Sequence, residues 1–457
     1  MDPDIDSSTV QQESRNRTAT SGHGRVPEHR IMPATLHPMH NSSPKGPIKI
    51  VDLFAGCGGF TQGFHEFRPS KRHKRPVFQS VAAVEHNIAA ASTYALNFAD
   101  ETGTDHIHAG DIEHWFPDEG EIEAEVILGG PPCQGFSGLG KGDIDDPRNK
   151  LWREYMRIVN TIKPKIFVIE NVDRFLKSPE FAALKKETED KENGELKDYD
   201  LLAPQVLNAA DYGVPQARRR AIVFGVRTDS PKLKSLVYPR KTHYNPRSPK
   251  RKSPSGAIPG LENFGAGELK PWVAVGPEIF DRTPAWALDF SLPPGRMCRP
   301  LGKAGASLPG PFLTGELNIG RRPERLSVLR YLKIPEGGNR HALRGKWDTI
   351  NNSKVYLSTT SWDRHNSGSG DVMGRMHRDR PSVTIRTEFY KPEKGRYLHP
   401  TLSRPITHLE AALIQGFPEN FRWCGSKLEI GRQIGNAVPV GLAEAIAGVI
   451  YEVLRKK

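Results

Sequence analysis

The residue best suited to covalent chemistry is Cys133. It stands in the segment Gly129-Gly-Pro-Pro-Cys-Gln-Gly-Phe-Ser137, directly after the apolar run Val126–Leu128. Two prolines restrict the backbone and glycines bound the segment, so the pattern indicates a rigid loop that holds a small thiol at the end of a strand. Cysteines more often fill buried apolar space, but a core position does not need such a loop. We therefore interpret Cys133 as a nucleophile that reacts as its thiolate.

An acid and a cluster of arginines follow at later strand ends. The apolar segment Phe167-Val-Ile-Glu-Asn-Val172 carries Glu170, which is placed to act as an acid toward a ring nitrogen. In Gln216-Ala-Arg-Arg-Arg220, strand alternation puts Arg218 and Arg220 on one side. A guanidinium can hold a base carbonyl while its neighbours bind phosphate. An ion pair at a strand end and a solvated basic edge are the alternative interpretations.

A glycine-rich turn and two acids predict a nucleoside site. The segment Asp52-Leu-Phe-Ala-Gly-Cys-Gly-Gly-Phe60 is typical of a strand that enters a helix through a turn where a ligand approaches the backbone. It departs from the dinucleotide pattern because Thr61 replaces the third glycine. Glu85 ends the next strand and suits ribose hydroxyls, while Asp111 and the apolar Ile112 suit adenine. An adenosine without phosphate fits this set.

Composition bounds the partners and the compartment. The 457 residues carry 65 Lys and Arg against 53 Asp and Glu, a formal charge of +12 that favours a polyanionic partner. Four cysteines lie far apart without a C-x-x-C pair, which argues against a disulfide framework or a structural zinc site. No run reaches the roughly 18 apolar residues of a membrane span. We expect a soluble cytoplasmic protein whose polar residues 1–46 form a disordered leader.

Short apolar runs alternate with helical stretches between residues 47 and 239. This alternation predicts a mainly parallel sheet with helices on both faces. After about residue 240 the sequence becomes irregular and rich in Pro, Gly, Arg and Lys, which indicates a second unit. The expected strands are at 48–54, 81–84, 107–108, 126–128, 166–169 and 221–226, and the expected helices at 87–98, 152–162, 409–415 and 441–454.

Taken together, the chain resembles the DNA cytosine-5 methyltransferase family, particularly the compact bacterial enzymes of restriction-modification systems. The resemblance rests on six segments in order: Asp52-Leu-Phe-Ala-Gly-Cys-Gly-Gly59, Gly130-Pro-Pro-Cys-Gln-Gly-Phe-Ser137, Glu170-Asn-Val172, Gln216-Ala-Arg-Arg-Arg220, Arg380-Pro-Ser-Val-Thr-Ile385 and Gly435-Asn-Ala-Val-Pro-Val440. It implies a doubly wound, Rossmann-like α/β catalytic domain that binds S-adenosylmethionine. Residues 47–239 and 405–457 would form this domain, the last helix completing the cofactor pocket, with an inserted target-recognition domain at 240–404.

The resemblance also implies roles for individual residues, without a metal. Cys133 would attack carbon 6 of a flipped-out cytosine, Glu170 would engage N3 and the amino group, and Arg218 the base oxygen. The stretch Gly138–Asn149 would close over the base. The expected S-adenosylmethionine contacts are Phe54, Gly56, Gly58, Glu85, Asp111, Ile112, Pro132, Leu151 and Asn436. The expected DNA contacts are Gln134, Ser137 and Arg220. Phosphate contacts, with a few base-edge contacts among them, are expected from the basic residues of the inserted region, and charges that only keep this region soluble are the alternative. These residues are Arg321, Arg322, Arg325, Arg340, Arg344, Lys346 and Arg375.

The expected substrate is double-stranded DNA, bound by a monomer that associates with the nucleoid and makes no membrane contact. A partner restriction endonuclease is the expected context, and an orphan or regulatory methylase is the alternative. A transfer RNA cytosine-5 methyltransferase with the same catalytic set is the second enzyme hypothesis. A non-catalytic DNA-binding relative is the third, although such proteins lose the nucleophile or the acid, and both Cys133 and Glu170 are present.

Overall fold

A computed structural model describes residues 46–99, 103–132, 148–248, 269–284, 289–302, 305–364 and 370–455. The predicted leader, except for its last residue, lies outside this part, as do the nucleophile Cys133 and the predicted DNA contacts Gln134 and Ser137. The same holds for most of the predicted closing stretch, 138–149. Contacts group residues 46–457 into one compact unit. The division at residues 240 and 404 therefore stays a prediction.

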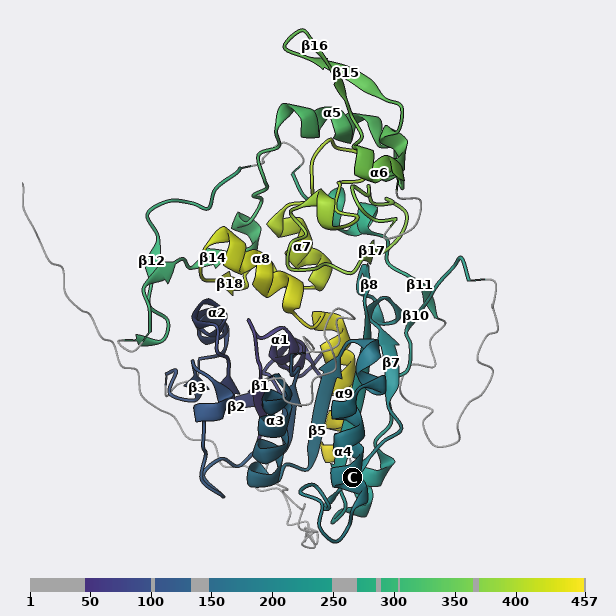
Figure 1. The fold of residues 1–457 in the computed structure, drawn as a ribbon. Helices are drawn as coiled ribbons and strands as arrows, with labels where there is room; N and C mark the ends of the chain where they lie inside the picture. The colour runs from purple at the N-terminus through teal and green to yellow at the C-terminus, as the bar shows by residue number, and fades with distance from the viewer. Residues whose placement is uncertain are drawn as a thin grey trace, which may run out of the picture. The chain divides into compact units, whose positions relative to one another are not determined.

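The centre of the fold is an eight-stranded sheet (Figure 1). Its order is β3-β2-β1-β4-β5-β9-β6, with β7 also paired to β9. Strands β1 to β5 are all parallel to one another, whereas β9 is antiparallel to β5, β6 and β7. The predicted runs are confirmed as strands of a mainly parallel sheet. The bounds are β1 Ile48–Leu53, β2 Phe78–Val84, β3 Ile107–His108, β4 Val126–Gly129, β5 Ile166–Asn171, β6 Tyr199–Leu201, β7 Gln205–Asn208 and β9 Arg219–Arg227.

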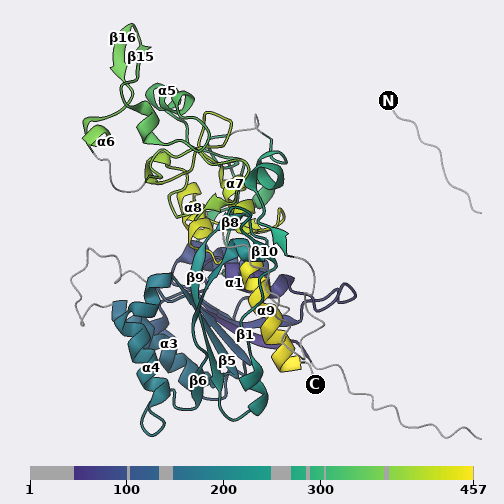
Figure 2. The ribbon, with the colours of Figure 1, turned by 90° about the vertical axis from the view of Figure 1, so that its right-hand side faces the viewer.

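Both faces of the sheet are covered, which explains why its central strands are mostly apolar. On one face, strand residues such as Ile50 and Phe224 pack with Phe64 of α1 and Ile446 of α9. On the other, Val51 and its neighbours pack with α3 and α4. Figure 2 shows α3 and α4 on one side of the sheet and α1 and α9 on the other. The doubly wound architecture is confirmed, with α1 Gly59–Glu66, α2 Ile88–Phe98, α3 Arg148–Ile162, α4 Pro179–Glu189 and α9 Val440–Arg455.

The C-terminal helix returns to the start of the fold. A Cβ atom added to Gly63 of α1 would lie 2.4 Å from Cβ of Ala443 in α9, and one on Gly59 would lie 2.7 Å from the carbonyl oxygen of Val438. Only glycine permits this approach, so the sequence of α1 determines where α9 packs. The preceding helices are α7 His408–Gln415 and α8 Lys427–Asn436, each with a capping box at its N-terminus.

Within the described part of the chain, no single helix is long and apolar enough to cross a membrane. Helices α8 and α9 pass that test only as a pair, bent by 43°.

The described residues between 240 and 404 form short strands and helices, and part of them packs around a small core. This core contains Tyr331, Leu343 and Leu398. The helices are α5 Arg325–Lys333 and α6 Thr360–Arg364. The paired strands are β10 His243–Tyr244 with β11 Lys270–Pro271, β12 Met297–Cys298 with β13 Leu308–Pro309, β14 Phe312–Leu313 with β18 Arg422–Trp423, β15 Trp347–Ile350 with β16 Ser353–Tyr356, and β17 Ser382–Val383 with β8 Gln216–Ala217. Single turns of 3-10 or π helix lie at 112–114, 173–177, 209–212, 231–235, 276–280, 314–316, 340–343 and 392–394.

One predicted phosphate contact in this region is wrong. Arg375 is 4% exposed, and its guanidinium donates to the backbone carbonyls of Tyr331, Ile334, His399 and Leu402. A guanidinium enclosed by carbonyls satisfies buried acceptors and is not available to DNA. Arg375 therefore joins three chain segments together, which its charge alone could not indicate.

Candidate active site

The predicted cofactor and catalytic residues come from neighbouring strand ends. The sheet order 3-2-1-4-5 places the carboxyl ends of five parallel strands along one edge. Asp111 follows β3, Glu85 follows β2, the glycine-rich turn follows β1, and Pro132 follows β4. Glu170 lies on β5, one residue before its end. In open parallel sheets ligands bind at this edge, so the fold brings the predicted set to one place.

The turn after β1 is held in a left-handed conformation at Phe54 (φ 57°), Gly56 (φ 58°) and Gly58 (φ 89°). A Cβ on Gly58 would lie 2.3 Å from the ring of Phe98, so glycine is required there. Apart from its two chain neighbours, no described residue would have an atom within 4 Å of a Cβ on Gly56. The backbone at Gly56 therefore borders open space that a ligand can enter. A positive φ at a non-glycine residue such as Phe54 is a strained conformation of the kind found at binding sites.

Glu85 holds this turn in place by hydrogen bonds and can still accept a hydrogen bond from a ligand. Its two carboxylate oxygens accept hydrogen bonds from the backbone N–H groups of Gly56 (2.9 Å) and Asn87 (2.7 Å). The side chain is 8% exposed. Oε2 can accept a second bond, which suits a ribose hydroxyl, whereas Oε1 also lies 3.2 Å from Nδ1 of His86. The carboxylates and open backbone fit an adenosine with a cationic sulfur better than a phosphate.

The remaining predicted cofactor residues differ in their exposure. Asp111 is exposed and accepts a hydrogen bond from the backbone N–H of Glu113, whereas Ile112 is 3% exposed and packs in the core. Leu151 is half-buried near the start of α3, and Asn436 is an exposed residue that ends α8. Pro132 is exposed.

A buried polar network below the turn was not predicted. Thr61 donates to Asp52 (2.7 Å), and the hydroxyl of Tyr94 lies 3.0 Å from that of Thr61 and 2.9 Å from that of Ser80. Asp52 is 2% exposed, and burial raises its pKa to about 7. The only sequence signal was a polar residue inside an apolar strand.

The segment that leads to Cys133 is fastened to the end of β5. Asn171 donates from Nδ2 to the carbonyl oxygen of Pro131 (3.0 Å), and a Cβ on Gly130 would lie 3.5 Å from Oε2 of Glu170. The Gly-Pro-Pro segment therefore lies beside the predicted acid. Asn171 was not predicted as a site residue, although it directly follows Glu170 in sequence.

The two predicted arginines differ in their partners. Nε of Arg220 lies 2.7 Å from Oε1 of Glu170, and both side chains are largely buried. Arg218 is 3% exposed and donates from Nη1 to the carbonyls of Ile385 (2.9 Å) and Gly435 (3.2 Å). Burial lowers the pKa of Arg218. The arginine paired with the acid is Arg220, whereas Arg218 binds backbone next to Asn436.

A glutamine pair strengthens the connection that Arg218 makes. Gln216 donates to the side chain of Gln415 (2.7 Å) and accepts from the backbone N–H of Ile385 (2.9 Å). Gln415 in turn donates to the carbonyl of Ile434 near the end of α8. This buried relay joins β8, just before Arg220, to the helix that ends at Asn436.

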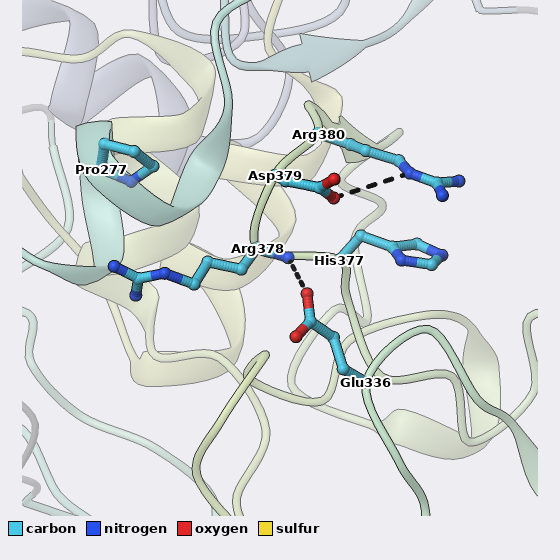
Figure 3. A pocket seen from close by; sticks show the side chains of 6 residues that line it. All are labelled: Pro277, Glu336, His377, Arg378, Asp379 and Arg380. Carbon is cyan, nitrogen blue, oxygen red and sulfur yellow. Dashed lines mark hydrogen bonds and ion pairs between the residues drawn. The ribbon is translucent and has the colours of Figure 1, made fainter. Parts of the chain in front are cut away.

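A separate pocket of about 550 Å³ lies in the irregular region (Figure 3). It is lined by Pro277, Glu336, His377, Arg378, Asp379 and Arg380. Side-chain ligand atoms of Glu336, His377 and Asp379 lie within 4.8 Å of one another. However, Glu336 accepts from the backbone N–H of Arg378, and Asp379 is ion-paired with Arg247 and Arg380. The acidic groups therefore already have donors or cations, and we assign no metal to them.

The fold and this edge define the class of protein. A parallel sheet of order 3-2-1-4-5 with an antiparallel strand beyond it is typical of an S-adenosylmethionine-dependent methyltransferase. The family model described as C-5 cytosine-specific DNA methylase matches residues 48–263 and 333–452. The chain belongs to this family. It is a DNA cytosine-5 methyltransferase with S-adenosylmethionine as methyl donor.

Named relatives agree over most of the chain. The type II methyltransferase M.XorII of Xanthomonas oryzae pv. oryzae is 31% identical over 89% of this chain and 85% of its own. M.NgoFVII of Neisseria gonorrhoeae is also 31% identical, over 90% and 89%. Among solved structures, DNMT2 of Spodoptera frugiperda shares the fold with a TM-score of 0.51 and 16% identity, covering 89% of this chain and 100% of that one.

Proposed function

We propose that the chain methylates one cytosine within a specific duplex sequence through a covalent adduct with Cys133. Carbon 5 of cytosine is a weak nucleophile until a thiolate adds to carbon 6. Bound S-adenosylmethionine supplies the methyl group. Loss of the carbon-5 proton then expels Cys133. A stacked base cannot present its face to a thiol, so the target cytosine must leave the duplex.

The pair of Glu170 and Arg220 supports this proposal most directly. When the extruded cytosine is bound, Glu170 engages N3 and the amino group. Arg220 then holds the base oxygen, a role that the family resemblance predicts for Arg218. The bond from Asn171 to Pro131 supports the argument, because it fastens the segment before Cys133 to the strand that carries the acid. Arg218 is a positioning residue in this scheme, since its described hydrogen bonds go to backbone carbonyls.

Trapping on duplex DNA that contains 5-fluorocytosine tests the nucleophile. Without a carbon-5 proton to lose, the adduct should persist, and mass spectrometry should locate it on Cys133. Cys133→Ser should abolish the adduct, and Cys57→Ser, which changes a buried thiol, should retain it. An adduct on another side chain, or efficient methylation by Cys133→Ser, would overturn the proposal.

A second assay separates the alternative functions by offering a labelled methyl donor with either duplex DNA or transfer RNA. A transfer RNA methyltransferase would label the RNA. A non-catalytic relative would label neither nucleic acid.

Target recognition is proposed for residues 240–404, with one surface named. Register places Trp347, Thr349, Lys354 and Tyr356 on the same face of the β15–β16 hairpin. Trp347 is 52% exposed, and the ammonium group of Lys354 lies 5.2 Å from its ring centroid.

The hairpin's opposite face carries Asp348, which pairs with Lys333 of α5. A two-stranded ribbon fits the major groove, and an exposed lysine suits phosphate, so we assign the outer face to the duplex.

Binding as a function of salt tests this surface. Lys354→Gln should lower affinity for duplex DNA and reduce the slope of log affinity against log salt by about one. Leu428→Ala is the control, because it changes an exposed side chain on α8. Equal affinities and slopes for wild type and Lys354→Gln would remove the hairpin from the interface.

The biological setting is also a proposal. The type II relatives support a modification enzyme that protects DNA from a partner endonuclease. A DNA substrate supports a cytoplasmic, nucleoid-associated protein. Because one chain supplies the predicted cofactor and base residues, we propose a monomer. Endonuclease challenge of DNA from cells that express the protein tests protection, and sedimentation tests the monomer.

A further inference from the structure

Two thiols outside the proposed active site meet in the folded chain. The Sγ atoms of Cys298 and Cys424 lie 3.2 Å apart, although 126 positions separate them in sequence. Cys298 belongs to β12, and Cys424 directly follows β18. The methylation scheme uses neither residue, so their proximity needs a separate explanation.

The backbone around the thiol pair holds the two sulfur atoms together. Strand β12 pairs with β13, and the carbonyl of Pro309 in β13 accepts from the backbone N–H of Gly425 (2.8 Å). A Cβ on Gly310 would lie 2.9 Å from the carbonyl oxygen of Trp423 and 3.5 Å from Sγ of Cys298. Glycine at 310 therefore lets the β12–β13 hairpin approach the strand before Cys424.

The two thiols differ in access to solvent. Cys424 is fully buried, whereas Cys298 is half-buried and adjoins Met297, which is 60% exposed. Burial and the neighbouring thiol raise the pKa of Cys424, which disfavours its thiolate. Cys298 is therefore the thiol that a small oxidant reaches first.

We propose that Cys298 and Cys424 form a two-thiol oxidation site that a hydroperoxide converts to a disulfide. The Cys298 thiolate attacks the peroxide and becomes a sulfenic acid, and water leaves once a proton is supplied. The Cys424 sulfur then displaces the sulfenic oxygen, which leaves as a second water. Overall the two thiols lose two electrons and two protons, and one hydrogen peroxide becomes two waters. An intracellular reducing pool would return the pair to thiols, so the bond is conditional.

The bond would join the hairpin to the cofactor side of the molecule. The backbone N–H of Cys424 donates to Thr93 of α2 (2.9 Å), and its carbonyl accepts from Gln433 of α8 (2.9 Å). Helix α2 begins just after Glu85, and α8 ends at Asn436. Oxidation therefore bonds the β12–β13 hairpin covalently to Cys424, which is hydrogen-bonded to the two helices beside the predicted cofactor residues.

Peptide mapping of the full-length protein after mild hydrogen peroxide tests the site. The Cys133→Ser background removes the reactive thiol of the proposed mechanism. A link between the peptides of Cys298 and Cys424 is expected, with a mass loss of about 2 Da that a dithiol reverses. Cys57→Ser should leave the link intact, because Cys57 is 2% exposed and its sulfur lies 3.7 Å from the carbonyl of Gln433.

Two variants keep the result interpretable. Cys298→Ser and Cys424→Ser should each abolish the link, and Cys298→Ser changes only a half-buried position, so its fold should persist. Three outcomes would each overturn the proposal. One is a stable sulfinic acid on Cys298, and another is a disulfide that involves Cys57. The third is that both thiols stay unreacted under conditions that already oxidise Met297. These outcomes are independent of the 5-fluorocytosine result, because the test requires no DNA and no methyl transfer.

Discussion

Nε of Arg220 lies 2.7 Å from Oε1 of Glu170, where β9 runs antiparallel to β5. The guanidinium and the acid thus face each other across the two strands. Removing either group leaves a largely buried charge without its partner, which costs more than the ion pair contributes. The pair therefore holds both side chains ready for a cytosine.

Substitution by lysine separates the roles of Arg220 and Arg218. Arg220→Lys should lower kcat by on the order of 100-fold, because lysine lacks the planar fork that holds the acid and a base oxygen. Arg218→Lys should lower the free energy of unfolding by about 2 kcal/mol, because two buried carbonyls lose their donor. Single-turnover methylation and urea unfolding measure the two effects. If Arg218→Lys lost turnover at unchanged stability, the base contact would belong to Arg218.

Stability should fall as pH rises from about 4 to about 7 because of Asp52. Burial raises its folded-state pKa from 3.8 to about 7, so the folded protein keeps a proton that the unfolded chain releases in this range. Between these pH values Asp52 lowers the free energy of unfolding by about 1.4 kcal/mol per pH unit, and this dependence disappears above pH 7. Urea unfolding at pH 5 and pH 8 should show that Asp52→Asn gains stability relative to wild type at the higher pH. The same pH dependence in both proteins would contradict this assignment.

Glu85 should control affinity for the methyl donor. Glu85→Gln removes the negative charge and one acceptor oxygen while the side chain keeps its size. We expect the Kd for S-adenosylmethionine to rise by about 10-fold or more, the effect of losing a charge-assisted hydrogen bond. Calorimetry without DNA measures it. Glu113→Gln, next to Asp111, is the control, and equal weakening by both variants would show a general charge effect instead.

Close packing of α1 on α9 should make Gly63 intolerant of a methyl group. Gly63→Ala would place Cβ 2.4 Å from Cβ of Ala443 and 2.5 Å from the carbonyl oxygen of Val440. Overpacking of this kind costs about 1–3 kcal/mol. Gly448→Ala in α9 is the matched control, since its nearest contact would be the Phe67 ring at 3.3 Å and alanine favours helix. Equal unfolding free energies for both variants would show that the two helices can separate.

Much of the fold and part of the site follow from local sequence. The apolar runs predict the six strands because a strand buried on both faces must be apolar throughout. The glycine-rich turn and Glu85 each directly follow an apolar run, so a parallel sheet brings them to the same edge. The acid Glu170 was predictable because it ends an apolar strand.

Side-chain partners that are distant in the chain required the tertiary structure. Sequence alternation put Arg218 and Arg220 on one side, but only packing gave Arg218 the carbonyls of Ile385 and Gly435 and left Glu170 to Arg220. Composition likewise marked Arg375 as a phosphate contact, whereas the fold encloses it with carbonyls.

The four cysteines show the same limit. Their spacing in sequence contains no metal or disulfide motif, yet the fold brings the sulfur atoms of Cys298 and Cys424 to 3.2 Å. The sequence by itself determined the strands, the turn and the family, because these depend on neighbouring residues and short motifs. Only the tertiary structure decided which buried charges and thiols meet, because a buried polar group takes whichever partner the packing of distant segments brings within reach.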